Sequence, residues 1–270
     1  METKGKKTVF GTKEWASSTL NLISGCAHDC KYCYAKETAV RKGFNTLAEW
    51  PNEKVRQNQL KRHQKKRDGT IMYPSSHDIT PEHIEEHVKI IGKLLQAGNQ
   101  LLIVSKPHLE CIKRLCLEFE ESKHRILFRF TIGSTNSNVL KFWEPNAPSF
   151  EERLECLQLA FESGFGTSVS SEPSLANSTD QVFDLVEKVR PFLNDAIWIG
   201  KMNNPYGRVK RNGHTDMETL KRLDDIVGFQ NDANIWIIYQ QYKNDPIVKW
   251  KESIKKVVGL EIPTEAGKDV

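Results

Sequence analysis

Short strand-like runs alternate with helical patterns along most of this 270-residue chain, and this alternation restricts the fold more than any other feature. The runs are apolar or β-branched, too short for helices, and lack the polar and apolar alternation of a half-solvated sheet. We expect strands at Thr19–Ile23, Thr70–Tyr73, Leu101–Val104, Ile126–Thr131, Thr167–Ser170, Ala196–Ile199 and Ile235–Tyr239. The pattern predicts an α/β fold, a parallel sheet with outer helices, and a partial (β/α)6-type TIM barrel fits it best.

Two of the intervening helices have recognisable starts. Thr80 followed by Pro81 is typical of a helix N-terminus, and the helical pattern that follows ends near Gly98. Ser149 has Glu152 three residues later, which predicts a capping box at the start of a second helix.

Polar residues gather where the predicted strands end. In barrels of parallel strands the chemistry collects at these carboxyl ends, so the residues that follow each strand are candidate site residues. They are Ser75, Ser76, His77 and Asp78; Ser105 and Lys106; Thr131 and Ser134; Ser170, Ser171 and Glu172; Gly200, Lys201, Met202 and Asn203; and Gln240 and Gln241.

The chain reads as one domain over residues 1–270, with an N-terminal extension at 1–15 and a helix and tail from about 246 to 270. Its composition, 38% hydrophobic and 27% charged, suits a globular protein with a sizeable core. No stretch approaches the roughly 18 apolar residues of a membrane span, and the first residues lack the apolar run of a signal peptide. We therefore expect a cytoplasmic protein with no membrane contact.

Three cysteines lie close together directly after the first predicted strand. The segment GCAHDCKYCYA places Cys26, Cys30 and Cys33 in a C-x3-C-x2-C spacing, so that three thiolates can meet at one metal centre. A structural zinc site or an electron-carrier cluster generally takes four protein ligands, whereas three leave one iron of a [4Fe–4S] cluster open to another molecule. The spacing therefore favours a cluster that binds a substrate or cosubstrate directly.

The alternative is a zinc site completed by His28 or by a distant residue such as His77. Zinc sites of this kind usually have a second ligand pair, but Cys111 and Cys116 are five positions apart in a helical pattern and Cys156 stands alone. We expect those three cysteines to be core or helix-surface thiols. We expect His28 to shape the cysteine loop without binding metal.

Positive charge is concentrated in two stretches of a chain whose formal net charge is only +4. Basic residues of this kind can neutralise phosphates at the mouth of a site, or can simply form solvated helix faces. The first stretch contains Lys61, Arg62, Lys65, Lys66 and Arg67, and the second contains Arg208, Lys210 and Arg211. We expect both stretches to flank the polar barrel mouth.

The cysteine loop resembles the signature of the radical S-adenosylmethionine (SAM) superfamily, and the tyrosines on both sides of Cys33 resemble the spore photoproduct lyase-like subfamily. The segments YPSSHDIT, VSKPHLE and FWEPNAPSFEERLECLQLAFESGFGTSVSSEP are also similar to that group. The resemblance implies a barrel of the radical SAM kind, a [4Fe–4S] cluster and bound SAM. It also implies an external electron donor such as flavodoxin or ferredoxin, and cleavage of SAM to methionine and a hydrogen-abstracting 5′-deoxyadenosyl radical.

The resemblance also assigns SAM contacts to individual residues. Tyr32 would lie against the adenine, largely through its backbone, while Lys106 and Ser134 would face the SAM carboxylate or ribose. Glu172 would accept hydrogen bonds from the ribose or the amino group. The residue types agree with this, since a carboxylate needs a cation such as Lys106 or Lys201 and hydroxyl groups need acceptors.

The resemblance fails at the hydrogen donor. Photoproduct lyases carry a cysteine near the exit of the second strand, where this chain has Ser75, Ser76, His77 and Asp78. A serine O–H bond is too strong to give up a hydrogen atom, which leaves Tyr34 as the best radical relay or as a packing aromatic.

Two hypotheses follow. In the first, the protein is a radical SAM enzyme acting on a small molecule, a nucleotide, a base in nucleic acid or a protein side chain. In the second, it is a nucleic-acid-binding module stabilised by a structural zinc ion or cluster, without catalysis.

Overall fold

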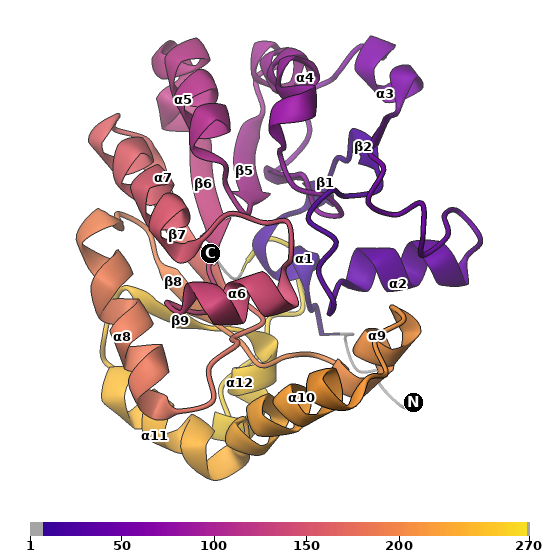
Figure 1. The fold of residues 1–270 in the computed structure, drawn as a ribbon. Coiled ribbons are helices and arrows are strands. Elements are labelled where there is room, and N and C mark those ends of the chain that lie inside the picture. Colours follow the sequence, from indigo (N-terminus) through magenta and orange to yellow (C-terminus); the bar gives the residue numbers. More distant parts are fainter. Residues whose placement is uncertain (1–7, 269–270) are drawn as a thin grey trace, which may run out of the picture.

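The computed structural model, which describes residues 8–268, contains one sheet of parallel strands in the order β1-β4-β5-β6-β7-β8-β9 (Figure 1). These strands are β1 (Ser18–Thr19), β4 (Thr70–Tyr73), β5 (Gln100–Ser105), β6 (Ile126–Thr131), β7 (Gly166–Ser171), β8 (Ile197–Ile199) and β9 (Val248–Trp250). A short antiparallel pair, β2 (Ile23–Ser24) and β3 (Lys54–Val55), lies beside the cysteine loop. The predicted fold class, a partial barrel with a parallel sheet and outer helices, is confirmed.

Helices α4, α5, α7, α8 and α11 follow one another around the outer side of the sheet (Figure 1). The α-helices are α1 (Thr12–Trp15), α2 (Tyr34–Arg41), α3 (Gln57–Lys61), α4 (Ile84–Gln96), α5 (Leu109–Glu118), α6 (Ser137–Trp143), α7 (Phe150–Glu162), α8 (Thr179–Val189), α9 (Pro205–Arg211), α10 (Met217–Phe229), α11 (Asp232–Tyr242) and α12 (Glu252–Val258). Short 3₁₀ turns occur at Pro81–His83, Glu120–Arg125 and Arg190–Phe192.

The core lies between the sheet and these helices. Helix α4 buries Ile91 and Leu94 at helical spacing, and they join strand residues such as Ile103 and Phe128 in one apolar cluster.

The two predicted helix starts are present in modified form. A 3₁₀ turn at Pro81–His83 precedes α4, and the Ser149 hydroxyl caps α7 by accepting from the Glu152 N–H at 3.3 Å. The Glu152 carboxylate instead accepts from the Leu109 N–H at 3.0 Å, so it serves a neighbouring helix.

One predicted strand is wrong. Residues Ile235–Tyr239 lie within α11, and the last strand of the sheet is β9. The run is rich in β-branched residues, but its buried positions Ile235, Ile238 and Tyr242 follow a helical period, and the Asn231 side chain caps the helix by accepting from the Asn234 N–H at 3.0 Å. Gln240 and Gln241 are therefore helical and do not follow a strand.

The terminal segments take part in the fold. The Val9 N–H donates to the Pro263 carbonyl at 2.9 Å, and the Gly267 N–H donates to the Lys13 carbonyl at 2.8 Å. Residues 1–7 of the expected N-terminal extension and residues 269–270 of the expected tail lie outside the described residues. Within 8–268, no helix is both long enough and apolar enough to cross a bilayer.

Candidate active site

A cavity of about 630 Å³ opens at the carboxyl ends of the parallel strands. Its wall combines the cysteine loop, the residues that follow β4, β5, β7 and β8, and the N-terminal residues 8–13. Most of the predicted site residues line it, namely Cys26, Tyr32, Cys33, Tyr34, Lys106, Glu172 and Lys201. Cys30 and Ser134 are not among the described residues of the wall, and the Ser134 hydroxyl accepts from the Asn136 N–H at 3.1 Å.

The backbone of the cysteine loop is shaped by two unusual residues. Gly25 has a φ of 94°, and a Cβ there would lie 2.7 Å from the Trp50 carbonyl oxygen, so only glycine fits. Asp29, between the first two cysteines, has a φ of 47°, which turns the chain back on itself. Cys33 then caps α2, its sulfur 3.4 Å from the Lys36 N–H. A thiolate at this position is favoured by the helix dipole.

The three thiols form no disulfides and suit a metal cluster. Burial raises the pKa of Cys26, Cys30 and Cys33, and each neighbouring thiolate raises the pKa of Cys26 further. Three neighbouring thiolates, two of them on buried residues, would thus repel one another unless cations lay among them, and the irons of a cluster supply that charge. Because Cys26 and Cys33 face the cavity, a cluster held here would be accessible to a small molecule.

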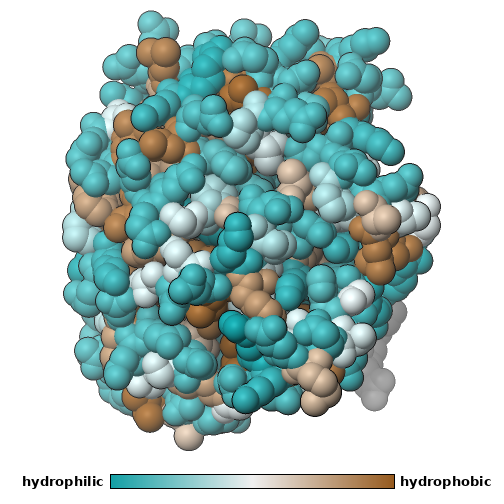
Figure 2. Space-filling view, viewed as in Figure 1, coloured by the Kyte–Doolittle hydropathy of each residue, from teal (hydrophilic) through white to brown (hydrophobic). Residues whose placement is uncertain are grey.

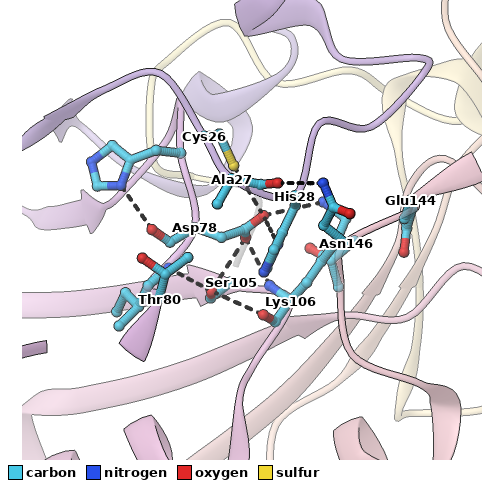
Figure 3. Close-up of polar contacts among 12 residues, drawn as sticks. Cys26, Ala27, His28, Asp78, Thr80, Ser105, Lys106, Glu144 and Asn146 are labelled. Atoms are coloured by element: carbon cyan, nitrogen blue, oxygen red, sulfur yellow. Dashed lines mark hydrogen bonds and ion pairs between the residues drawn. The ribbon is translucent and has the colours of Figure 1, made fainter. Parts of the chain in front are cut away.

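Asp78 is the polar centre behind the cysteine loop (Figure 3). Its carboxylate accepts from the Lys106 N–H at 2.8 Å and from the Ser105 hydroxyl at 3.2 Å, and it lies 3.5 Å from the Lys106 ammonium. The same carboxylate is 2.8 Å from His28 Nδ1. Although burial opposes ionisation, Lys106 and His28 hold the pKa of Asp78 well below its ordinary value. Asp78 was expected among the site residues at a strand end, but its link between Lys106 and the cysteine loop was not predicted.

The histidines named for the zinc alternative have other partners. Among the residues that the structure describes, one set of three His, Cys, Asp or Glu side chains has its ligand atoms close enough together for a metal ion. The set is Cys26, His28 and Asp78, whose ligand atoms lie within 4.8 Å of one another. Both ring nitrogens of His28 are engaged, Nδ1 by Asp78 and Nε2 by His108 Nε2 at 2.8 Å. His77 Nε2 accepts from the Leu22 and Ile23 N–H groups, each at 3.1 Å. The geometry therefore favours structural roles for both histidines.

Tyr32 places its side chain in the core. Its hydroxyl donates to the Glu144 carboxylate, which also pairs with the Arg153 guanidinium at 2.5 Å, and the side chains of Glu144 and Arg153 are fully buried. The segment with Glu144 also supports the loop, since the Asn146 side chain donates to the Ala27 carbonyl at 2.9 Å. These supporting residues were not predicted, although they lie in the quoted segment FWEPNAPSF. The backbone of Tyr32 is thus the part left to face a ligand.

Tyr34 stands at the cavity beside Cys33, and the residue is 42% exposed. Its hydroxyl donates to the Ser75 carbonyl, at the strand exit where photoproduct lyases would have a cysteine. The Arg208 guanidinium lies 5.8 Å from the centre of the Tyr34 ring. A phenol is therefore held in the wall next to the thiols.

Glu172 lies across the cavity in a buried ionic cluster. Its carboxylate is 3.2 Å from the Lys251 ammonium and accepts from the Asn203 side-chain amide at 3.0 Å. Lys251 also lies 2.8 Å from the Glu14 carboxylate. Lys201 is directed toward α11, 3.9 Å from the Asp232 carboxylate. Lys251 and Glu14 were not predicted.

The two basic stretches lie in different places, which corrects the expectation that both flank the mouth. The first stretch precedes β4, where the Arg67 N–H donates to the Asn99 side chain at 2.8 Å, just before β5 begins. It therefore lies at the amino ends of the strands, opposite the cavity. Of the second stretch, Arg208 lines the cavity and Arg211 pairs with Glu37 at 3.1 Å. Only the second stretch is at the mouth.

The other cysteines lie in the core as expected. Cys111, Cys116 and Cys156 are buried between α5 and α7, away from the loop.

On the outer surface, the face in Figure 2 is mostly hydrophilic, and its apolar side chains form small separate groups. This face therefore offers no broad apolar surface for a partner.

Known proteins share this fold. A spore photoproduct lyase complexed with a dinucleoside spore photoproduct superposes with a TM-score of 0.56 at 16% identity, covering 92% of this chain and 79% of that chain. SuiB from Streptococcus suis bound to S-adenosylmethionine gives a TM-score of 0.54 at 11% identity, covering 93% of this chain and 54% of that chain. At these identities the similarity establishes the fold alone.

Sequence comparison identifies the family. An uncharacterised protein of Methanocaldococcus jannaschii is 25% identical over 195 residues, 71% of this chain and 73% of its own length. An uncharacterised protein of Acidianus two-tailed virus is 26% identical over 224 residues, 77% of this chain and 71% of its own length. The radical SAM superfamily profile matches residues 20–188, more than half of the chain. The chain therefore belongs to the radical SAM superfamily, whose chemistry uses SAM and an iron–sulfur cluster.

Proposed function

We propose that Cys26, Cys30 and Cys33 hold a [4Fe–4S] cluster with one iron open to SAM, and that the protein is an enzyme of spore photoproduct lyase-like type. The observation that carries this proposal is one cavity whose wall contains two of the three thiols together with Lys106, Lys201 and Glu172. With an electron from an external donor such as flavodoxin or ferredoxin, the bound cluster would supply reductive cleavage of SAM to methionine and a 5′-deoxyadenosyl radical, which abstracts hydrogen from an organic substrate.

The two sides of the cavity offer opposite charges to the polar groups of SAM. The Lys106 ammonium has three donor hydrogens, so it can keep its contact with Asp78 and also bind the SAM carboxylate. Lys201 is the alternative cation for that carboxylate. Across the cavity, the Glu172 carboxylate can accept from the ribose or the amino group. The Tyr32 backbone is available for the adenine, since its hydroxyl is committed to Glu144.

Tyr34 is the group we assign to hydrogen transfer. The Ser75 carbonyl fixes its hydroxyl beside the thiols, and Ser75 and Ser76 themselves have O–H bonds too strong to serve. A phenol O–H is weaker, so Tyr34 can give a hydrogen atom to a substrate radical in the cavity. The tyrosyl radical that this leaves would return to the phenol by taking one electron from the external donor and one proton.

Arg208 suggests what the substrate carries. Asp78, Lys106 and Glu172 all have oppositely charged partners, whereas Arg208 lines the same cavity and forms no ion pair with any residue in the described range 8–268. A guanidinium in this position is suited to a phosphate. We therefore infer that the substrate is a nucleotide or a nucleic acid whose phosphate lies near Arg208.

Anaerobic reconstitution tests the proposed cofactor. We expect about four irons per chain, as a [4Fe–4S] cluster requires, with a reduced-cluster spectrum that SAM perturbs and with slow release of 5′-deoxyadenosine. Zinc at about one ion per chain, with no response to SAM, would instead favour the structural nucleic-acid-binding module.

Salt dependence tests the proposed substrate class. A single-stranded oligodeoxynucleotide should bind with a log–log salt slope of about −0.7 per phosphate neutralised, and Arg208→Gln should flatten that slope. Lys210→Gln, an exposed position on the same helix, is the matched control and should change binding less. If DNA, RNA and nucleotides all fail to bind at low salt, the substrate is an uncharged small molecule or a peptide.

A further inference from the structure

Three neighbouring strand exits lie in register beside the cavity. Ser171 of β7 pairs with Ile199 of β8, and Ile199 pairs with Trp250 of β9. The next residue of each strand is therefore Glu172, Gly200 or Lys251, and these three stand side by side. Lys251, directly after β9, must cross the end of β8 to reach Glu172, directly after β7.

Gly200 makes this crossing possible. A Cβ on Gly200 would lie 2.9 Å from Cγ of Lys251 and 3.0 Å from Cγ of Glu172, closer than carbon atoms pack. Without that Cβ, the Lys251 side chain passes over the middle strand and places its ammonium 3.2 Å from the Glu172 carboxylate. The absence of a side chain at Gly200 thus determines where the Glu172 carboxylate is held.

The same ammonium holds the N-terminal segment. Lys251 has a fully buried side chain, and its ammonium lies 2.8 Å from the Glu14 carboxylate and 3.7 Å from the centre of the Trp15 ring. It also donates to the Gly11 carbonyl at 3.3 Å. The Glu14 carboxylate accepts in turn from the Gly11 N–H at 2.7 Å and from the Glu252 N–H at 3.0 Å. Helix α1 is therefore fixed to the end of β9 by a buried ionic cluster.

This N-terminal segment forms part of the cavity wall. Residues 8–13 and Trp15 line the cavity, and Trp15 packs edge-on against Trp198 of β8, with the ring centres 5.6 Å apart. One lysine therefore contacts both a wall segment from the start of the chain and a carboxylate that faces the ligand space.

We propose that Lys251 is a positioning residue that makes the orientation of Glu172 depend on docking of residues 8–15, so that SAM binding and docking of this segment favour each other. This inference rests on the proposed function, because it takes Glu172 as a SAM contact. Coupling between two equilibria is reciprocal: a segment that improves the site when docked must itself be held more firmly when SAM binds.

Hydrogen exchange and SAM binding together test the coupling. In reconstituted protein, we expect SAM to slow amide exchange in residues 8–15. We also expect Glu14→Gln and Gly200→Ala each to weaken SAM binding by about tenfold, the size of one lost charge-assisted contact. Glu14→Gln keeps the shape of the side chain and should speed exchange in the segment. Lys256→Met, an exposed lysine on α12, is the control and should leave SAM affinity and exchange unchanged.

The outcomes separate a positioning role from a general loss of structure. Glu14→Gln should retain the wild-type iron content and melting temperature within a few degrees while SAM affinity falls. Unchanged exchange on SAM addition, or unchanged affinity in both variants, would overturn the inference and leave the proposed function standing. A wild-type protein that takes up the cluster but does not bind SAM would refute the proposed function, and the inference with it.

Discussion

Two buried lysine–carboxylate pairs stand at the same edge of the sheet, and they differ in charge balance. Beside the cysteine loop, where the iron–sulfur cluster is proposed, Lys106 and His28 both contact Asp78, and we call this the cluster side. Beside residues 8–15 and β9, Lys251 is shared by Glu172 and Glu14, and we call this the terminal side. The first group has at least one cation for its single carboxylate, whereas the second has two carboxylates for one cation.

The pKa shifts of the two carboxylates follow this difference. Lys106 and His28 overcome burial and depress the pKa of Asp78. Burial raises the pKa of Glu172, and Lys251 only partly offsets this because Glu14 adds negative charge to the same site. The cluster side is thus electrostatically satisfied before any ligand binds. The terminal side retains acceptor capacity, which suits a ligand that brings hydrogen-bond donors or positive charge.

Removing a thiol should have the largest effect on the cluster side. We expect Cys26→Ala, Cys30→Ala and Cys33→Ala each to abolish iron incorporation, because a cluster with three protein ligands has none to spare. Iron analysis and the visible spectrum after anaerobic reconstitution measure this. Cys111→Ala, Cys116→Ala and Cys156→Ala are the controls and should bind iron normally. An intact cluster in any variant of the first group would exclude the proposed ligand set.

Replacing the lysine of each pair should lower the free energy of unfolding by different amounts. Lys251→Met leaves two buried carboxylates without their cation, which should lower the free energy of unfolding by about 3–5 kcal/mol. Lys106→Met should cost less, because Asp78 keeps its contacts with His28 and the Ser105 hydroxyl. Urea unfolding of the metal-free protein at neutral pH measures both, with Lys256→Met as the control. A larger loss in Lys106→Met would reverse the comparison.

The cluster side could be predicted from the sequence to a greater extent than the terminal side. Cys26, Asp78 and Lys106 follow recognisable strands or stand in a short motif, so their meeting at one edge follows from parallel topology. On the terminal side, Glu172 alone was predicted, because it also follows a recognisable strand. Lys251 follows β9, where Lys249 interrupts the apolar residues and the segment from about 246 was expected to be a helix and tail. Glu14 lies in a segment with no helical or strand pattern of its own. Lys251 and Glu14 lie near opposite ends of the chain, so no local sequence pattern predicts their contact.

Two expectations were wrong, the strand at Ile235–Tyr239 and the place of the first basic stretch, and each has a physical cause. Ile235–Tyr239 has strand-like composition, but the position of the core decides which of its side chains are buried, and that position follows from the other elements. The first basic stretch was expected at the mouth from its charge alone. It precedes a strand, and residues before a parallel strand lie at the edge opposite those that follow it.

Affinity for SAM should depend on both pairs. Lys106→Ala and Glu172→Ala each remove one charge-assisted contact, so each should cost about 1.5–3 kcal/mol, or roughly ten- to a hundredfold in Kd. Titration calorimetry with reconstituted protein measures this. Ser134→Ala should change affinity least, since Ser134 does not line the cavity. If Lys106→Ala binds normally and Lys201→Ala does not, the SAM carboxylate contacts Lys201.

The pH dependence of stability should give the smallest and most specific effect. Glu172 faces Lys251 and Glu14 in its ionic cluster, Asn203 beside the cavity, and Arg208 from α9. Because its folded pKa is raised, the folded protein binds this proton more tightly than the unfolded chain, whose glutamate pKa is about 4.3. The contribution of Glu172 to stability is therefore fully present below that value and is lost as pH rises through the folded pKa.

Glu172→Gln removes this titration and leaves Lys251 paired one-to-one with Glu14, a balance closer to that of the cluster side. Urea unfolding of both metal-free proteins at a series of pH values should show the variant gaining stability relative to wild type as pH rises through this window. A relative stability that falls with pH would mean that the Glu172 carboxylate is favoured in the folded protein, and the difference between the two pairs would disappear.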